Sequence, residues 1–182
     1  MAAKTGTYSL IASSTLSSTS ASVTFSSIPA TFTDLVLVIT GVGATGTTFP
    51  WMRFNSLSTN IYSDTHLYGS GSTAGSGRRT AQSRGYVAEY VELGTTQVTN
   101  TIVHIMDYSN STTNKTYLVR NNNATTGTYV GAEAIVGMVQ LTSAITSITI
   151  GTASTGTDYN FASGSTFKLY GIEAGNISWT VQ

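Results

Sequence analysis

The chain contains no cysteine, and this absence removes several classes of protein at once. Disulfide bonds, thiolate metal sites and cysteine nucleophiles are excluded, so stability must come from side-chain packing or from neighbouring subunits. Charge is also scarce, because 9% of residues are charged, against about 25% in an average soluble protein. Eight basic and eight acidic residues cancel, and no basic run could neutralise successive phosphates. We therefore expect no nucleic-acid partner.

Long apolar runs are missing too. No segment has 18 uninterrupted apolar residues, and the most apolar stretch, Ala132 to Ile150, is broken by Glu133, Gln140 and several Thr and Ser. Residues Met1 to Leu10 have one Lys and no apolar run of signal-peptide length. We expect a soluble protein without a membrane partner, made in the cytoplasm without a classical export signal.

The residues that are present favour a folded chain. Ser and Thr make up roughly a third of the 182 residues, and apolar residues make up 40%. Disordered chains usually lack the aromatic and β-branched residues that are plentiful here. The length suits one compact domain, residues 1–182, with its own hydrophobic core.

Period-two alternation recurs from end to end, whereas no sustained helical stripe is present. This pattern predicts an all-β fold. With only two prolines, the number of short strands is typical of an antiparallel β-sandwich, and we expect a jelly-roll; a closed barrel is the alternative. The predicted strands are Thr7 to Ala12, Ala21 to Ser26, Asp34 to Thr40, Trp51 to Asn55, Tyr86 to Leu93, Thr99 to Tyr108, Lys115 to Arg120, Thr128 to Leu141, Ser147 to Gly151, Thr166 to Glu173 and Ile177 to Val181.

Segments rich in Gly, Ser, Thr and Asn are expected to be turns. They are Gly41 to Thr48, Gly69 to Gly77, Ser109 to Asn114, Asn121 to Gly127 and Ala153 to Gly164.

One predicted strand, Asp34 to Thr40, is apolar on both faces. We therefore expect it to be central in its sheet or covered by another subunit. We consider the same burial against another subunit for Tyr86, Tyr90 and Val91.

The densest basic segment contains Arg78, Arg79 and Arg84 in a Gly/Ser-rich context. We interpret it as a solvated loop tip, and an anion or partner site is the alternative.

Residues Gly41 to Gly46 match the dinucleotide-binding pattern G-x-G-x-x-G after an apolar strand, with Asp64 downstream. Such a site needs a helix that begins at the third glycine and turns its amides towards the pyrophosphate. Here Pro50 lies within an aromatic, strand-like run instead, and Thr47 stands where a P-loop requires Lys. The segment therefore predicts a loop without nucleotide affinity, and we expect no cofactor.

The two histidines, His66 and His104, lack a second ligand at metal-site spacing. Asp107 follows His104 by three residues, which puts the two on opposite faces of a regular strand. No G-x-S-x-G elbow accompanies the many serines. We expect no metal site and no catalytic residue, and therefore no enzyme.

Carboxylate pairs for glycoside cleavage would be Glu89 with Glu92, or Asp107 with Glu133. The first pair is three apart in a predicted strand and should point to opposite faces. The aromatics considered for stacking on sugar rings are Trp51, Tyr62, Tyr68 and Trp179, although most aromatics in a sandwich belong to its core.

Two stretches resemble a known family. The opening residues Tyr8 to Leu16, continued by Val23 to Pro29 and Thr33 to Leu37, are similar to the start of a family of tailed-bacteriophage virion proteins. Ala144 to Ile150 and Phe161 to Ile172, with the ending F-x-x-G-S-x-x-x-L-Y-G-I, resemble that family's closing strands. Arg53 to Asn55 and Asn60 to Ser63 are similar more loosely, so that about half the chain is covered.

The resemblance implies a viral structural protein, since members are capsid decoration proteins and tail or fibre components. It brings no catalytic residues. We expect a homotrimeric decoration (cement) protein that binds itself and the major capsid protein on the outer head surface. The alternative is a tail or fibre module that binds a host surface glycan; a free lectin domain and a secreted hydrolase are more distant. Gly164 and Gly171 are expected to flank a strand, and Leu169 and Ile172 to fill the core.

Overall fold

The described part of the chain consists of β-strands joined by loops. The computed structural model describes residues 7–46, 48–123, 131–153 and 159–173. These residues include no helix, and so none that could cross a membrane. The strands are β1 (Tyr8–Thr15), β2 (Ser22–Phe25), β3 (Asp34–Gly41), β4 (Phe49–Phe54), β5 (Tyr62–Gly69), β6 (Ala74–Gln82), β7 (Gly85–Tyr86), β8 (Thr99–Met106), β9 (Lys115–Asn123), β10 (Gly131–Val139), β11 (Ile148–Ala153) and β12 (Thr166–Ile172).

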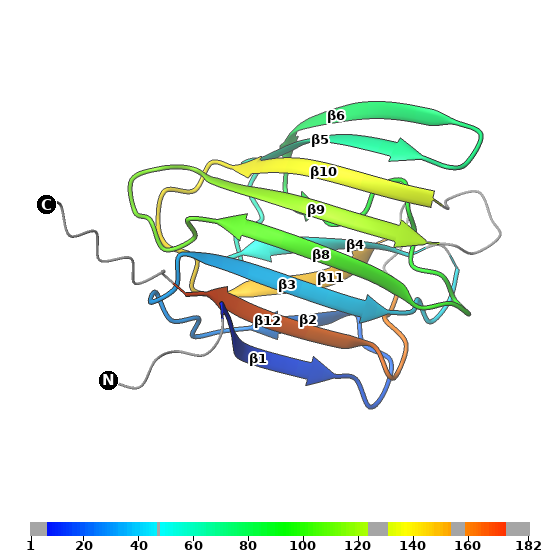
Figure 1. The fold of residues 1–182 in the computed structure, drawn as a ribbon, viewed down its shortest axis with the longest axis horizontal. Helices are drawn as coiled ribbons and strands as arrows, with labels where there is room; N and C mark the ends of the chain where they lie inside the picture. The colour runs from blue at the N-terminus through cyan, green and yellow to red at the C-terminus, as the bar shows by residue number, and fades with distance from the viewer. Residues whose placement is uncertain (1–6, 47, 124–130, 154–158, 174–182) are drawn as a thin grey trace, which may run out of the picture.

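Two antiparallel sheets of unequal width pack face to face, which confirms the predicted all-β sandwich (Figure 1). The eight-stranded sheet has the order β1-β12-β3-β8-β9-β10-β5-β6, and the four-stranded sheet has the order β2-β11-β4-β7. Partners are nested along the chain, since β1 pairs with β12, β2 with β11, β3 with β8 and β4 with β7.

The core between the sheets follows from the alternation in the sequence. β3 lies between β12 and β8, as its two apolar faces predicted, and Leu35, Leu37 and Ile39 are fully buried. Phe161 and Phe167 pack edge to face, with ring centroids 4.9 Å apart. Each such side chain stabilises the fold by about 1.5–3 kcal/mol relative to its exposed state. Leu169 is in the core as expected, whereas Ile172 lies on the opposite face of β12 and is half-buried.

The narrow sheet does not cover the whole inner face of the wide one, and the β7–β8 connection, residues 87–98, covers part of the remainder. The predicted strand Tyr86 to Leu93 is therefore wrong beyond Tyr86, although Val87, Val91 and Leu93 are fully buried. A buried loop has backbone groups with no ladder partner, and these must be satisfied by side chains. Inward-facing polar residues of the wide sheet do this: the Asn121 amide donates to the Val91 carbonyl, and that of Asn123 to the Glu92 carbonyl, each at 2.9 Å.

The β5–β6 hairpin forms one edge of the wide sheet, and the sequence did not predict it. Gly69 to Gly77 was expected to be a turn, but β6 begins at Ala74. The loop-tip interpretation of Arg78 and Arg79 is therefore wrong, because both lie on this strand. The β5–β6 register shifts between Tyr62 and Asp64, and the β1–β12 register at the opposite edge shifts between Leu10 and Ala12.

Residues Gly41 to Gly46 form a connection between two strands, as predicted. β3 ends at Gly41, and the next described element is strand β4, with no helix between them. Gly46 has φ +57°, a conformation that glycine adopts without strain. The predicted strand Ile177 to Val181, residue Trp179 and the start of the predicted strand Thr128 to Leu141 lie outside the described residues.

Candidate interaction surface

The outer face of the wide sheet, which points away from the core, has an apolar stripe. Side chains alternate between the two faces, so the neighbours of the buried residues point outwards. The register aligns them across the sheet in two adjacent rows. The first row runs across the strands through Leu10, Tyr170, Val36, His104, Leu118 and Val136, each paired with the next. The second row runs in the same way through Val38, Ile102, Arg120, Ala134 and Leu67. We call the apolar members the outer stripe: Leu10, Val36, Val38, Leu67, Ile102, Leu118, Ala134, Val136 and Tyr170.

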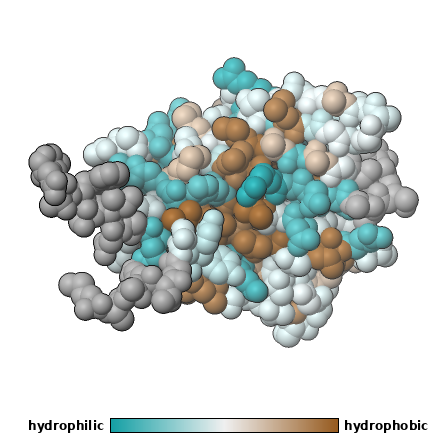
Figure 2. Space-filling model, viewed as in Figure 1, coloured by the Kyte–Doolittle hydropathy of each residue, from teal (hydrophilic) through white to brown (hydrophobic). Residues whose placement is uncertain are grey.

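Much of the outer stripe is open to solvent. Leu67 is 61% exposed, Val136 58% and Leu10 56%. Figure 2 shows hydrophobic atoms along the middle of this face with hydrophilic ones among them. Contiguous apolar surface of this kind marks interaction sites in soluble proteins.

A cleft of about 360 Å³ opens on the stripe between aromatic and charged side chains. Tyr8 and Tyr170 meet edge to face on one side of it, with centroids 6.5 Å apart. His104 and Arg120 also line it, together with Val36, Val38 and Ile102. Among the described residues, Arg120 forms no ion pair, so the cleft combines apolar walls with an unpaired positive charge.

His104 is held at the cleft by Asp34 rather than by Asp107. Its Nε2 lies 2.8 Å from Asp34 Oδ2. Asp107 follows the end of β8, and its backbone N–H donates to Asp34 Oδ1 at 2.8 Å. The structure therefore brings His104 and Asp107 to a common partner without direct contact between their side chains.

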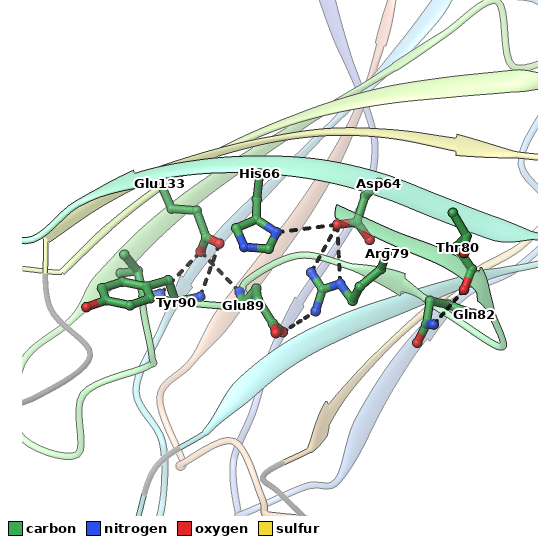
Figure 3. A network of polar contacts seen from close by, with 9 residues as sticks. Asp64, His66, Arg79, Thr80, Gln82, Glu89, Tyr90 and Glu133 are labelled. Carbon is green, nitrogen blue, oxygen red and sulfur yellow. Dashed lines mark hydrogen bonds and ion pairs between the residues drawn. The ribbon is translucent and has the colours of Figure 1, made fainter. Parts of the chain in front are cut away.

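A charged cluster lies on the other face of the wide sheet, beneath β5 and β6 (Figure 3). The Asp64 side chain is fully buried, and Arg79 donates to its Oδ1 through Nε at 3.3 Å and Nη2 at 3.0 Å. Arg79 also pairs with Glu89 of the β7–β8 connection and stacks over Tyr86, 3.5 Å from the ring centroid. Burial opposes its charge, but Asp64 and Glu89 outweigh burial and raise the pKa of Arg79. This arginine ties the connection to the sheet.

Glu133 of β10 fixes the same connection through its backbone. Its carboxylate accepts the N–H groups of Glu89, Tyr90 and Val91 at 3.1–3.2 Å. Burial raises the pKa of Glu133 more than these three donors lower it. Tyr90 and Tyr68 stack beside it, with centroids 3.5 Å apart. Tyr90 and Val91, which the sequence offers for a subunit interface, therefore make contacts within the chain.

The carboxylate pairs considered for glycoside cleavage do not form a site. Glu89 and Glu92 lie on the connection rather than on a strand. Glu133 on β10 pairs with Asn121 on β9, which pairs with Thr101 on β8. Thr101 is six residues before Asp107 along the chain. At about 3.3 Å per residue, roughly 20 Å separates Glu133 from Asp107 along the sheet.

The aromatics considered for sugar stacking have other roles. Tyr62 is fully buried, and its hydroxyl accepts the Phe54 N–H at 3.0 Å. Tyr68 stacks on Tyr90. Trp51 is half-buried, with the guanidinium groups of Arg53 and Arg84 over its ring.

The described ranges contain no group of three His, Asp or Glu side chains that could hold a metal ion. No protein-family model, curated protein or solved structure matches this chain.

Proposed function

We propose that this chain is a non-enzymatic structural protein of a tailed-bacteriophage particle, which assembles through the outer stripe. The observation that carries the proposal is the stripe itself, an apolar band that crosses seven neighbouring strands of the wide sheet and has members more than half exposed within the described chain. The resemblance of the opening and closing strands to phage virion proteins supports the same role. Two of the buried carboxylates are used to hold the fold, since Asp64 binds Arg79 and Glu133 binds backbone amides.

Within the particle, we place the chain on the outer head surface as a homotrimeric decoration protein that cements major capsid subunits. A surface with little charge suits packing against itself and against a capsid lattice, because few charges must lose their hydration. The nested strand pairing supports a jelly-roll core made of β1–β4, β7, β8, β11 and β12, to which the hairpins β5–β6 and β9–β10 add width.

Placing glutamate at two exposed stripe positions, Leu67 and Val136, is expected to dissociate the oligomer. Both side chains are more than half exposed, so the monomer should still fold, whereas a charge buried in an apolar interface is strongly unfavourable. Light scattering at micromolar concentration should give a trimer for the wild type and a monomer for the double variant. Val98→Glu is the matched control, because Val98 is 57% exposed but lies outside the stripe. A monomeric wild type would contradict the prediction.

The cement role predicts that particles without this protein assemble but release their DNA at a lower temperature. A ligand that binds only the assembled shell stabilises it by RT ln(1 + [L]/Kd), about 4 kcal/mol per site at a thousandfold excess over Kd. Wild-type, deletion and Leu67→Glu/Val136→Glu particles should be heated side by side, with copy number measured by mass spectrometry. The two altered particles should open early. Equal release temperatures, few copies and lost host attachment would instead favour a tail or fibre module that binds a host surface glycan.

A further inference from the structure

The outer face of the narrow sheet carries a second cluster, made of Trp51, Arg53 and Arg84. Trp51 and Arg53 alternate with buried Met52 on β4, and Arg84 follows in the β6–β7 turn. Trp51 pairs with Gly151 of β11, where an added Cβ would overlap the indole. The ring therefore lies across the Gly151 backbone, which fixes its position on the sheet.

The two arginines are ordered by this ring. The Cζ atoms of Arg53 and Arg84 lie 4.7 Å and 5.3 Å from the indole centroid. Arg53 Nε donates to the Ser83 carbonyl at 3.1 Å, and its terminal nitrogens have no hydrogen-bond partner among the residues that the structure describes. A guanidinium stacked on an aromatic ring keeps its N–H edge available, and that edge matches the two oxygens of an oxyanion.

These two charges have no counter-charge in the described chain. Neither Arg53 nor Arg84 forms an ion pair there, whereas Arg79, also stacked on an aromatic ring, binds both Asp64 and Glu89. The distances to the shared ring place the two Cζ atoms at most 10 Å apart. In a chain with zero net charge, this is a local positive excess on a preorganised support.

We propose that Trp51, Arg53 and Arg84 form an oxyanion site that receives a carboxylate from an acidic segment of a partner protein. A neutral or charged sugar fits less well, because sugar rings bind by stacking on aromatic faces and guanidinium groups lie over the Trp51 and Tyr86 rings. The site is on the sheet opposite the outer stripe and does not depend on it. It would give the protein a second, electrostatic point of attachment.

Indole fluorescence of the isolated protein tests the site directly. The chain has two tryptophans, so a Trp179→Phe background leaves Trp51 as the single reporter. Titration with sodium sulfate, and with a capped tetraglutamate peptide, is expected to give a saturable change at constant ionic strength. Arg53→Gln and Arg84→Gln should each weaken binding at least tenfold. Arg84→Lys should also weaken it, because lysine keeps the charge without the flat N–H fork.

Arg78→Gln is the matched control, since it removes the same charge from an exposed position on β6 and should leave both titrations unchanged. Urea unfolding confirms that each variant is folded. Absence of saturation, or an equal loss in Arg78→Gln, overturns the site. Tighter binding of an oligogalacturonate than of the peptide overturns the protein partner. These measurements use the isolated protein and depend neither on particles nor on contacts through the outer stripe, so their failure is separate from failure of the cement role.

Discussion

Replacing Arg79 with methionine is expected to lower the free energy of unfolding by about 3–5 kcal/mol, because it leaves the buried charge of Asp64 without its partner. The Asp64 side chain is fully buried and receives two hydrogen bonds from the guanidinium. Arg79 also holds Glu89 and covers Tyr86, so the β7–β8 connection should loosen as well. Urea unfolding followed by circular dichroism measures the loss.

The neighbouring Arg78→Met provides the control for Arg79→Met. Arg78 is exposed on the same strand, and surface substitutions of this kind usually stay within about 0.5 kcal/mol. Adding Asp64→Asn to Arg79→Met should recover part of the loss, because the uncompensated charge is then gone. If Arg79→Met and Arg78→Met were equally stable, the buried ion pair would not contribute as described.

Replacing Glu133 with alanine should be similarly severe, at about 3–4 kcal/mol. Each hydrogen bond to a charged group contributes roughly 1.5–3 kcal/mol, and three buried N–H groups lose their acceptor together. Relief of the desolvation of the buried carboxylate offsets part of this sum. Residues 89–91 should open more easily than the rest of the fold, because all three donors belong to them. Hydrogen exchange should show faster exchange of these amides, while amides of β3 and β8 stay protected. Ala132→Ser, at an exposed neighbour on β10, should change neither quantity.

The pH dependence of stability supplies a second readout for Glu133. Burial raises the folded-state pKa of Glu133 above the ordinary glutamate pKa of 4.5, so the folded protein binds this proton more readily than the unfolded chain. Its contribution is therefore fully present below about pH 4.5 and declines as the pH rises through the folded pKa. Relative to Glu133→Gln, which cannot titrate, the wild type should lose stability as the pH rises. A stability difference that is constant with pH would contradict this assignment.

Alternation predicted most of the strands that form the core, but it missed the β5–β6 hairpin at the edge of the wide sheet. β12 alternates because it buries one face on the narrow sheet, whereas β3 lies at the middle of the wide sheet and is apolar on both faces. β6 instead reads Ala-Gly-Ser-Gly-Arg-Arg-Thr-Ala-Gln, because an edge strand with little cover needs no apolar face. Conversely, Val87 to Leu93 has strand-like residues but forms a buried loop, and Glu133 binds backbone amides of this loop.

The candidate surface could not be located from the sequence, because it depends on the register between distant strands. Val36 and Val136 are 100 positions apart, and only the pairing of β3, β8, β9 and β10 places them in one row. The sequence did show that β3 is apolar on both faces, which is the local sign of the stripe. In the same way, the arginine-rich segment was recognised, but the indole that orders Arg84 comes from β4.

Both free edges of the wide sheet are irregular, and this limits how copies of the chain can stack. β1 shifts its register between Leu10 and Ala12, and β6 carries two adjacent arginines, with Ala81 at φ +55° near its end. Bulges, twists and edge charges are the features that prevent strand addition from a neighbouring molecule. Growth by strand addition is thereby opposed at both edges of the wide sheet, while its outer face stays available. For the particle protein that we propose, irregular edges would allow a high local concentration without polymerisation before assembly.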